Sequence, residues 1–194
     1  MDFDSIVKKR KSARSFKSSV PSWKDILLAI DAALQGPYAG NINNLKFLIV
    51  ENKDTIKKIA KHCDQIWIEE SGLLIIALSD DRNLENMYGE RGRVYSRQQA
   101  GAAIQTILLK LTDLNIDSCW TGAYTDELIR QILDIPQHIQ IEAIIPTGYE
   151  QKDQVKVKPS KKELDSVLQW ERWEQYKRPS FFEESPDKYA LRSS

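Results

Sequence analysis

Leu73-Leu74-Ile75-Ile76-Ala77-Leu78 is the longest uninterrupted apolar run in the sequence. A short apolar run between polar residues is typical of a strand that is covered on both faces of a sheet. Residues 47–50 have the same pattern, and further strands are expected at 118–120 and at about 139–145. The run is far below the ~18 apolar residues that a membrane span needs, so the sequence predicts no membrane partner.

Apolar residues recur at helical spacing around these strands. In the segment 22–35, Ser22 is expected to cap a helix that ends at Gly36-Pro37. Its predicted core-facing residues are Trp23, Ile26, Leu27, Ile30, Ala33 and Leu34. Further helices are expected at 54–63 with Asp54 as the cap, at 97–114 followed by a left-handed Asn115, and at 126–133. This alternation predicts an α/β or α+β layered domain with helices flanking a sheet.

Composition limits the partners and the compartment. In 194 residues, 28 Lys plus Arg balance 28 Asp plus Glu, so no net field attracts nucleic acid or an anionic membrane. Cys63 and Cys119 are too few and too far apart for a disulfide framework. The start of the chain lacks the pattern of a signal peptide, and a cytoplasmic location is expected.

The C-terminal segment is rich in aromatic residues but poor in aliphatic ones. Its aromatic residues are Trp170, Trp173, Tyr176, Phe181, Phe182 and Tyr189. Such a segment cannot form its own core, so its rings either fold back on their own domain or wrap a partner subunit. We therefore expect a domain over 1–159 and an extended arm over 160–194.

Several common catalytic motifs are missing. The sequence contains no Gly-x-Gly-x-x-Gly after a strand, no Walker-type phosphate loop and no Gly-x-Ser-x-Gly. Their absence argues against a Rossmann dinucleotide-binding enzyme, a P-loop nucleotide hydrolase and an α/β-hydrolase. His62 and His138 have no partners at metal-ligand spacing, so no metal site is predicted. The carboxylate pairs 69–70 and 80–81 are expected to be solvated loop residues.

Phe3, Ile6 and Val7 have helical spacing and predict a short first helix. A cluster of cations follows it. Lys8-Lys9-Arg10-Lys11-Ser12-Ala13-Arg14 surrounds a small hydroxyl residue with forked and mobile donors, which makes it a candidate phosphate cradle. By itself, such a run of charges is more often a solvated face than an anion site.

Further segments give the cluster a context. Arg10-Lys11-Ser12-Ala13-Arg14-Ser15-Phe16 resembles the Arg-Arg-Ser-x-Arg-x-Phe opening of the FMN-dependent nitroreductase family, and Gly36-Pro37 with Asn41-Ile42-Asn43 is similar to its Ala-Pro-Ser-x-x-Asn-x-Gln motif. Asn44-Leu45 replaces the family's Pro-Trp pair. Residues 101–105, 118–124, 133–136, 146–149 and 156–158 resemble later motifs, so the similarity spans roughly 3–173.

The resemblance implies a fold, an assembly and a cofactor. The implied fold is α+β with three layers, in which helices flank a central, mostly antiparallel sheet and an extended C-terminal arm follows. Family members are homodimers that hold FMN at the subunit interface. Flavin carries the redox chemistry, so no catalytic side chain is required.

The resemblance also implies the residues that contact FMN. Arg10, Lys11, Ser12, Lys156 and Lys158 are expected at the phosphate, and Asn41 and Asn43 at the ribityl chain and ring. Arg14 is expected at the N1 edge of the ring, where negative charge develops on reduction. Thr121, Gly122 and Ala123 are expected at the N5 and O4 edge, where small residues let the backbone approach.

The implied activity is ping-pong transfer of a hydride from NADH or NADPH, through FMN, to a nitroaromatic or quinone-type acceptor. The alternatives are a flavin-dependent reductive dehalogenase, an enzyme that consumes its own reduced flavin with oxygen, a non-enzymatic FMN sensor or store, and a nucleic-acid binder that uses 8–14. Trp120 is expected in the core and Cys119 as a small buried residue. Segment 80–97 lies where the family has a lid and is expected to be mobile.

Overall fold

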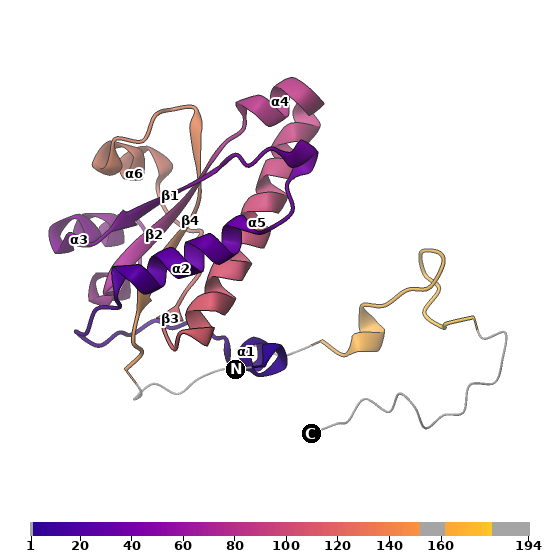
Figure 1. The fold of residues 1–194 in the computed structure, drawn as a ribbon, viewed down its shortest axis with the longest axis horizontal. Coiled ribbons are helices and arrows are strands. Elements are labelled where there is room, and N and C mark those ends of the chain that lie inside the picture. Colours follow the sequence, from indigo (N-terminus) through magenta and orange to yellow (C-terminus); the bar gives the residue numbers. More distant parts are fainter. Residues whose placement is uncertain (1, 152–161, 180–194) are drawn as a thin grey trace. The chain divides into compact units, whose positions relative to one another are not determined.

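The computed structural model describes residues 2–151 and 162–179, and the chain divides into two compact units, Met1–Gln154 and Val155–Ser194. The first unit contains a four-stranded sheet in the order β1-β2-β4-β3, and each neighbouring pair is antiparallel (Figure 1). Its strands are β1 (Leu45–Val50), β2 (Leu73–Asp80), β3 (Asp117–Ser118) and β4 (Ile139–Gly148).

The predicted central strand is confirmed, because every residue of β2 except Asp80 is buried. Residues 47–50 are also covered on both faces, because Phe47 and Ile49 pack against one core and Leu48 and Val50 against the other. β1 is nevertheless an edge strand, and only Val50 in it is classed as buried. Periodicity cannot separate an edge strand from a central strand when both runs are short and apolar.

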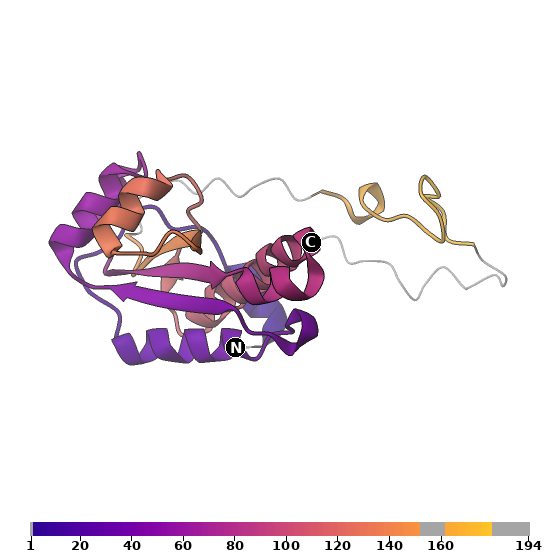
Figure 2. The same ribbon diagram turned by 90° about the horizontal axis from the view of Figure 1, so that it is seen from above.

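Alternate residues of β2 and β4 point to two separate cores. One face, with Ile75 and Ile145, packs against α2 (Trp23–Leu34) and α5 (Glu90–Asp113). The other, with Ile76 and Ile144, packs against α3 (Lys53–Lys61) and α6 (Asp126–Leu133). Figure 2 shows α3 and α6 on one side of the sheet and α2 on the other. The three-layer α+β fold expected from the sequence is therefore confirmed.

Two details of the helices differ from the prediction. Ser22 caps α2 by accepting from the Lys24 amide, as expected, but α3 is capped by Asn52, which accepts from the Thr55 amide, and not by Asp54. α2 buries Ile26, Ala29 and Ala33. Three predicted core residues of this helix are instead exposed: Trp23, Leu27 and Leu34.

The segment 80–97 is helical and not a loop. It forms α4 (Arg82–Tyr88) and the start of α5, which therefore begins well before the expected Arg97. The two helices pack closely at Gly92, where an added β-carbon would lie 2.3 Å from the Leu84 carbonyl oxygen. Asn115 follows α5 in the left-handed conformation, as predicted.

The second unit is described for residues 162–179. It contains one short 3-10 helix, η3 (Leu164–Ser166), and a turn in which the Trp170 amide donates to the Gln175 carbonyl at 2.7 Å. Trp173 and Tyr176 are exposed, while Phe181, Phe182 and Tyr189 lie outside the described residues. No helix within 2–151 or 162–179 is long and apolar enough to cross a membrane.

Candidate functional site

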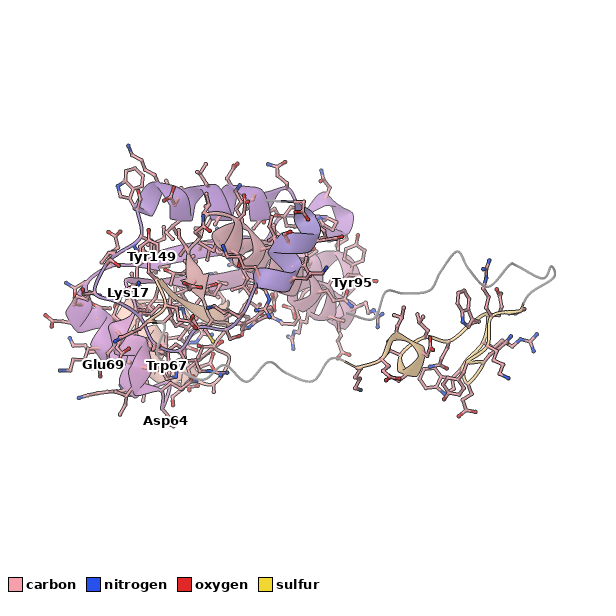
Figure 3. All side chains as sticks on the ribbon, turned by 90° about the horizontal axis from the view of Figure 1, so that it is seen from below. Lys17, Asp64, Trp67, Glu69, Tyr95 and Tyr149 are labelled. Carbon is pink, nitrogen blue, oxygen red and sulfur yellow. The ribbon has the colours of Figure 1, made fainter. Side chains whose placement is uncertain are left out.

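The segment after α1 (Phe3–Lys9) lies along the β3 edge of the sheet. Ser12 forms a parallel bridge with Ser118, and the Ala13 amide donates to the Ser118 carbonyl at 3.0 Å. Further on, the Lys17 amide donates to the Tyr149 carbonyl at 2.8 Å, and Figure 3 shows Lys17 and Tyr149 side by side. Two segments from distant parts of the sequence are thereby held in register.

The extended conformation of this segment sorts its side chains. Ala13 and Ser15 are buried, whereas Ser12 and Arg14 are exposed. Arg14 stands two residues beyond the bridge on its strand, as Trp120 does beyond Ser118 on the other. Arg14 is therefore the exposed cation of the segment that pairs with the strand leading to 121–123.

Lys11 has protein partners that the sequence did not reveal. Its ammonium group forms an ion pair with Glu150 and lies 3.9 Å from Asp117. The predicted phosphate ligand is thus engaged by carboxylates. Arg10 and Arg14 have no carboxylate partner within the residues that the structure describes, and Lys156 and Lys158 lie outside those residues.

Gly122 and Ala123 are exposed and follow Thr121, which is buried. The backbone of Thr121 pairs in both directions with Ile144, at 2.9 and 3.0 Å. Its hydroxyl is buried and finds no hydrogen-bond partner within the described part of the chain. A buried polar atom without a partner is rare and costly. Gly122 and Ala123 are exposed, and an added β-carbon at Gly122 would meet nothing within 4 Å.

Trp120 does not lie in the core, contrary to expectation. It is 41% exposed, and a β-carbon added at Gly101 of α5 would lie 3.9 Å from its ring. The apolar character of an indole did not decide its position, because the chain turns outward there. Cys119 is buried, as predicted.

Asn41 and Asn43 belong to a tight turn that includes η1 (Ala39–Asn41). Gly40 and Asn41 are both left-handed, with φ of 58° and 57°. A β-carbon at Gly40 would lie 2.7 Å from the Tyr88 hydroxyl oxygen, so the turn packs against the end of α4. The Asn43 side-chain oxygen accepts from the Leu45 amide at 3.0 Å.

This turn lies far from the β3 edge. α4, which contacts the turn, and α1, which precedes Arg10, are at opposite ends of α5 in Figure 1. Consistent with this, Lys9 donates to the side-chain oxygen of Asn115, the second residue after α5, at 2.6 Å. The structure therefore pairs the Arg10–Arg14 segment with the strand that precedes 121–123 but does not bring Asn41 and Asn43 to it.

Asp81 is not a solvated loop residue, contrary to expectation. It is buried, forms an ion pair with Arg97 and accepts a hydrogen bond from Ser96. Arg97 also pairs with Glu142, which occupies an irregularity in the β2–β4 register. Adjacent aspartates in the sequence do not reveal that α5 places Arg97 against Asp81, because the two residues are distant along the chain.

Comparisons with known proteins show to which family the chain belongs. A family model described as the nitroreductase family matches residues 7–74 and 63–149. A relative from Methanothermobacter thermautotrophicus, provisionally named NADH dehydrogenase/NAD(P)H nitroreductase, is 30% identical over 77% of this chain and 78% of its own length. An iodotyrosine deiodinase from Thermotoga neapolitana is 25% identical over 74% of this chain and 86% of its own length.

Solved structures show the same fold. A nitroreductase family protein from Clostridium novyi NT has a TM-score of 0.73 at 25% identity, covering 90% of this chain and 96% of that chain. An FMN-dependent nitroreductase from Clostridium difficile R20291 has a TM-score of 0.71 at 20% identity, covering 84% and 96%. Fold and relatives together define an α+β oxidoreductase. The chain belongs to the nitroreductase family.

Proposed function

We propose that the protein is an FMN-dependent oxidoreductase that takes a hydride from NADH or NADPH and passes electrons to a nitroaromatic or quinone-type acceptor. One observation carries the proposal: the buried, unpartnered hydroxyl of Thr121 lies beside an open Gly122-Ala123 backbone. A buried polar atom without a partner is costly and marks a point of the chain that function can retain. The groups that the N5 and O4 edge of a flavin would contact are the exposed backbone atoms of Gly122 and Ala123 next to it.

The β3 edge also supplies the charges that FMN requires. Arg10, Ser12 and Arg14 present cationic and hydroxyl donors along one extended segment, whose register is fixed by the Ser12–Ser118 bridge. Arg10 and Ser12 would hold the phosphate, and Arg14 would stabilise negative charge at the N1 edge. Lys11 would contribute through its pair with Glu150, and Lys156 and Lys158 remain proposed phosphate ligands.

We infer that the working form is a homodimer that holds FMN at the subunit interface. A single chain leaves the Asn41 turn at the far end of α5 from Arg10, so a second chain would place its Asn41 and Asn43 against the ribityl chain and ring. The outer face of α2 supports this assembly, because Trp23, Leu27 and Leu28 are about half exposed. Apolar side chains clustered on a surface mark interaction sites.

When bound, FMN supplies the hydride-accepting and electron-donating chemistry. The protein's own part is positional: Gly122 and Ala123 allow close approach, Arg14 provides a fixed charge, and the small side chains at 122 and 123 leave room for a nicotinamide or an acceptor in turn. Sharing one face of the ring between two substrates is the basis of a ping-pong reaction. No acidic or nucleophilic side chain is needed at the ring.

A second candidate is reductive removal of a halogen from an aromatic ring. It is favoured by the similarity to the deiodinase of Thermotoga neapolitana and by the fold shared with an iodotyrosine deiodinase solved with FMN and 3-iodo-L-tyrosine. The two activities use the same cofactor site and differ in the acceptor. Segment 80–97, which stands where the family has a lid, is the expected source of that choice.

Steady-state assays distinguish these functions. NADH or NADPH oxidation is measured with a quinone, a nitroaromatic compound and a halogenated tyrosine as separate acceptors, with FMN added. Parallel initial-rate lines with the quinone or the nitroaromatic support the proposed reductase, while halide release from the tyrosine alone supports the dehalogenase. FMN binding without turnover of any acceptor indicates a sensor or store.

A further inference from the structure

A buried polar relay connects the Asn41 turn to the ion pair at the end of β2. Gln99 of α5 accepts from the Ala39 amide at 2.7 Å and donates to the Ile42 carbonyl at 3.3 Å, so it grips the turn at both ends. The same Gln99 amide group donates to Asn44 at 2.7 Å. We name Gln99, Asn44, Ser96 and Asp81 the Gln99 relay.

The relay is buried along its whole length. The Asn44 side-chain nitrogen donates to the Ser96 hydroxyl at 2.7 Å, and that hydroxyl donates to Asp81. Gln99, Asn44 and Asp81 are 6–7% exposed and Ser96 is fully buried. Buried polar groups are costly unless every member is satisfied, so this geometry is strongly specified.

Asp81 at one end and the turn backbone at the other fix the direction of the hydrogen bonds in the relay. A carboxylate paired with Arg97 can only accept, so Ser96 must donate to it and must accept from the Asn44 nitrogen. The Asn44 oxygen then faces the Gln99 nitrogen, and the Gln99 oxygen faces the Ala39 amide. The charge at the other end of the relay therefore requires the same orientation of the Gln99 amide as the turn backbone does, so the two ends reinforce each other.

The relay also accounts for the departure of this chain from the family motif. Asn44 stands where the family has proline, and its side chain supplies the two central hydrogen bonds. Its carbonyl accepts from the Asp80 amide at 2.9 Å, which ties the turn to the end of β2. A proline ring fixes the backbone of a turn, whereas here a buried side chain does so.

Resting on the proposed function, we infer that Gln99 is a positioning residue for the flavin: through the relay it sets the orientation of Asn41 and Asn43 toward FMN. The conformation it holds is strained, because Asn41 is left-handed. Without the Gln99 grip, the turn loses the bonds at Ala39 and Ile42. The contacts of Asn41 and Asn43 with FMN then become less ordered.

The test compares Gln99→Glu with Gln98→Glu in the full chain. Gln98 is the exposed neighbour on α5, so the control makes the same chemical change outside the relay. The introduced carboxylate at 99 cannot donate to Asn44 or to the Ile42 carbonyl. We expect FMN affinity to fall at least tenfold in Gln99→Glu and less than twofold in Gln98→Glu, with a changed visible spectrum of the remaining bound FMN.

A second measurement follows the turn itself. In protein freed of FMN, hydrogen exchange of the Ala39 amide should be at least tenfold faster in Gln99→Glu, while β2 amides exchange as in the wild type. If Gln99→Glu does not fold, Ser96→Ala interrupts the same relay by removing one hydroxyl group. The direction of the bonds is tested by Gln99→Glu combined with Asp81→Asn, which lets the three side-chain bonds from residue 99 through Asn44 and Ser96 to residue 81 reverse and keeps the Ala39 amide as a donor, so part of the affinity should be recovered.

The outcomes separate the inference from the proposed function. Wild-type protein that binds FMN, together with unchanged affinity and unchanged Ala39 exchange in the relay variants, overturns the role of Gln99 and leaves the proposed function standing. Wild-type protein that does not bind FMN overturns both.

Discussion

Ser12 and Ser118 lie side by side in a parallel bridge, with the Ala13 amide 3.0 Å from the Ser118 carbonyl oxygen. This pairing adds the N-terminal segment to the β3 edge of the sheet. It places the segment that carries Arg10 and Arg14 alongside the strand that leads to Thr121. A cationic cluster that is proposed to bind phosphate and the exposed backbone at 122–123 thereby become parts of one proposed site.

The two arginines should dominate FMN affinity. A hydrogen bond to a charged group contributes about 1.5–3 kcal/mol, so Arg10→Gln and Arg14→Gln should each weaken FMN binding by about 10- to 100-fold in fluorescence titrations. Lys8→Gln removes an exposed charge from the last turn of α1 and serves as the control, with less than a twofold effect. Full FMN affinity in the Arg10→Gln/Arg14→Gln double variant would refute the site assignment.

Gly122 should be important for binding and unimportant for folding. An added β-carbon there meets nothing within 4 Å, so Gly122→Val should change the free energy of unfolding by less than about 0.5 kcal/mol. FMN affinity should fall at least tenfold, because the side chain keeps the backbone away from the ring. Gly92→Ala, which collides with Leu84, should show the opposite result, with a loss of about 1–3 kcal/mol of stability. Equal FMN affinity in Gly122→Val and wild type would remove residues 122–123 from the site.

The outer face of α2 should be a subunit contact. Leu27 and Leu28 are 44% and 51% exposed, so a Leu27→Glu/Leu28→Glu variant would place charges in an apolar interface. Sedimentation should show a dimer for the wild type and a monomer for this variant, which should also bind FMN more weakly. Lys57→Glu on the exposed side of α3 should remain a dimer. A double variant that stays dimeric would place the interface elsewhere.

Stability should decline at alkaline pH. Burial raises the pKa of the Cys63 thiol to about 11 and the pKa of Tyr124 to about 12. Unfolded chains release these protons at lower pH, so the folded state binds more protons and loses up to about 1.4 kcal/mol per pH unit per group above the unfolded pKa. Cys63→Ala should flatten the decline between about pH 9 and 11, and Tyr124→Phe between about pH 10 and 12, in urea unfolding. Unchanged slopes would contradict this assignment.

Much of the fold was predictable from the sequence, because its strongest signals reflect burial. The apolar run of β2, the Ser22 cap and the left-handed Asn115 all depend on local chemistry. What local patterns did not show was contact between distant elements. The predicted solvation of Asp81 was wrong because its partner Arg97 lies far away in the sequence, on α5. In α2, three of the six residues predicted to face the core are instead exposed: Trp23, Leu27 and Leu34.

The candidate site was predictable as a set of residues but not as an arrangement. Motif resemblance selected Arg10, Ser12, Arg14 and Thr121, and the structure places these on one edge of the sheet. Sequence reasoning missed Gln99. The available signal was Asn44 in the place of the family's proline, because the Asn44 side chain is the hydrogen-bond partner of Gln99. Sequence reasoning also missed the pairing of Lys11 with Glu150, which depends on the register between the N-terminal segment and the end of β4.

The most direct test is a titration of the purified protein with FMN, followed by absorption at about 450 nm, where oxidised flavin absorbs, and by sedimentation in the same samples. We predict saturable binding of one FMN per chain, with the flavin absorbance and the protein sedimenting together as a dimer. Colourless monomeric protein at saturating FMN would contradict the account.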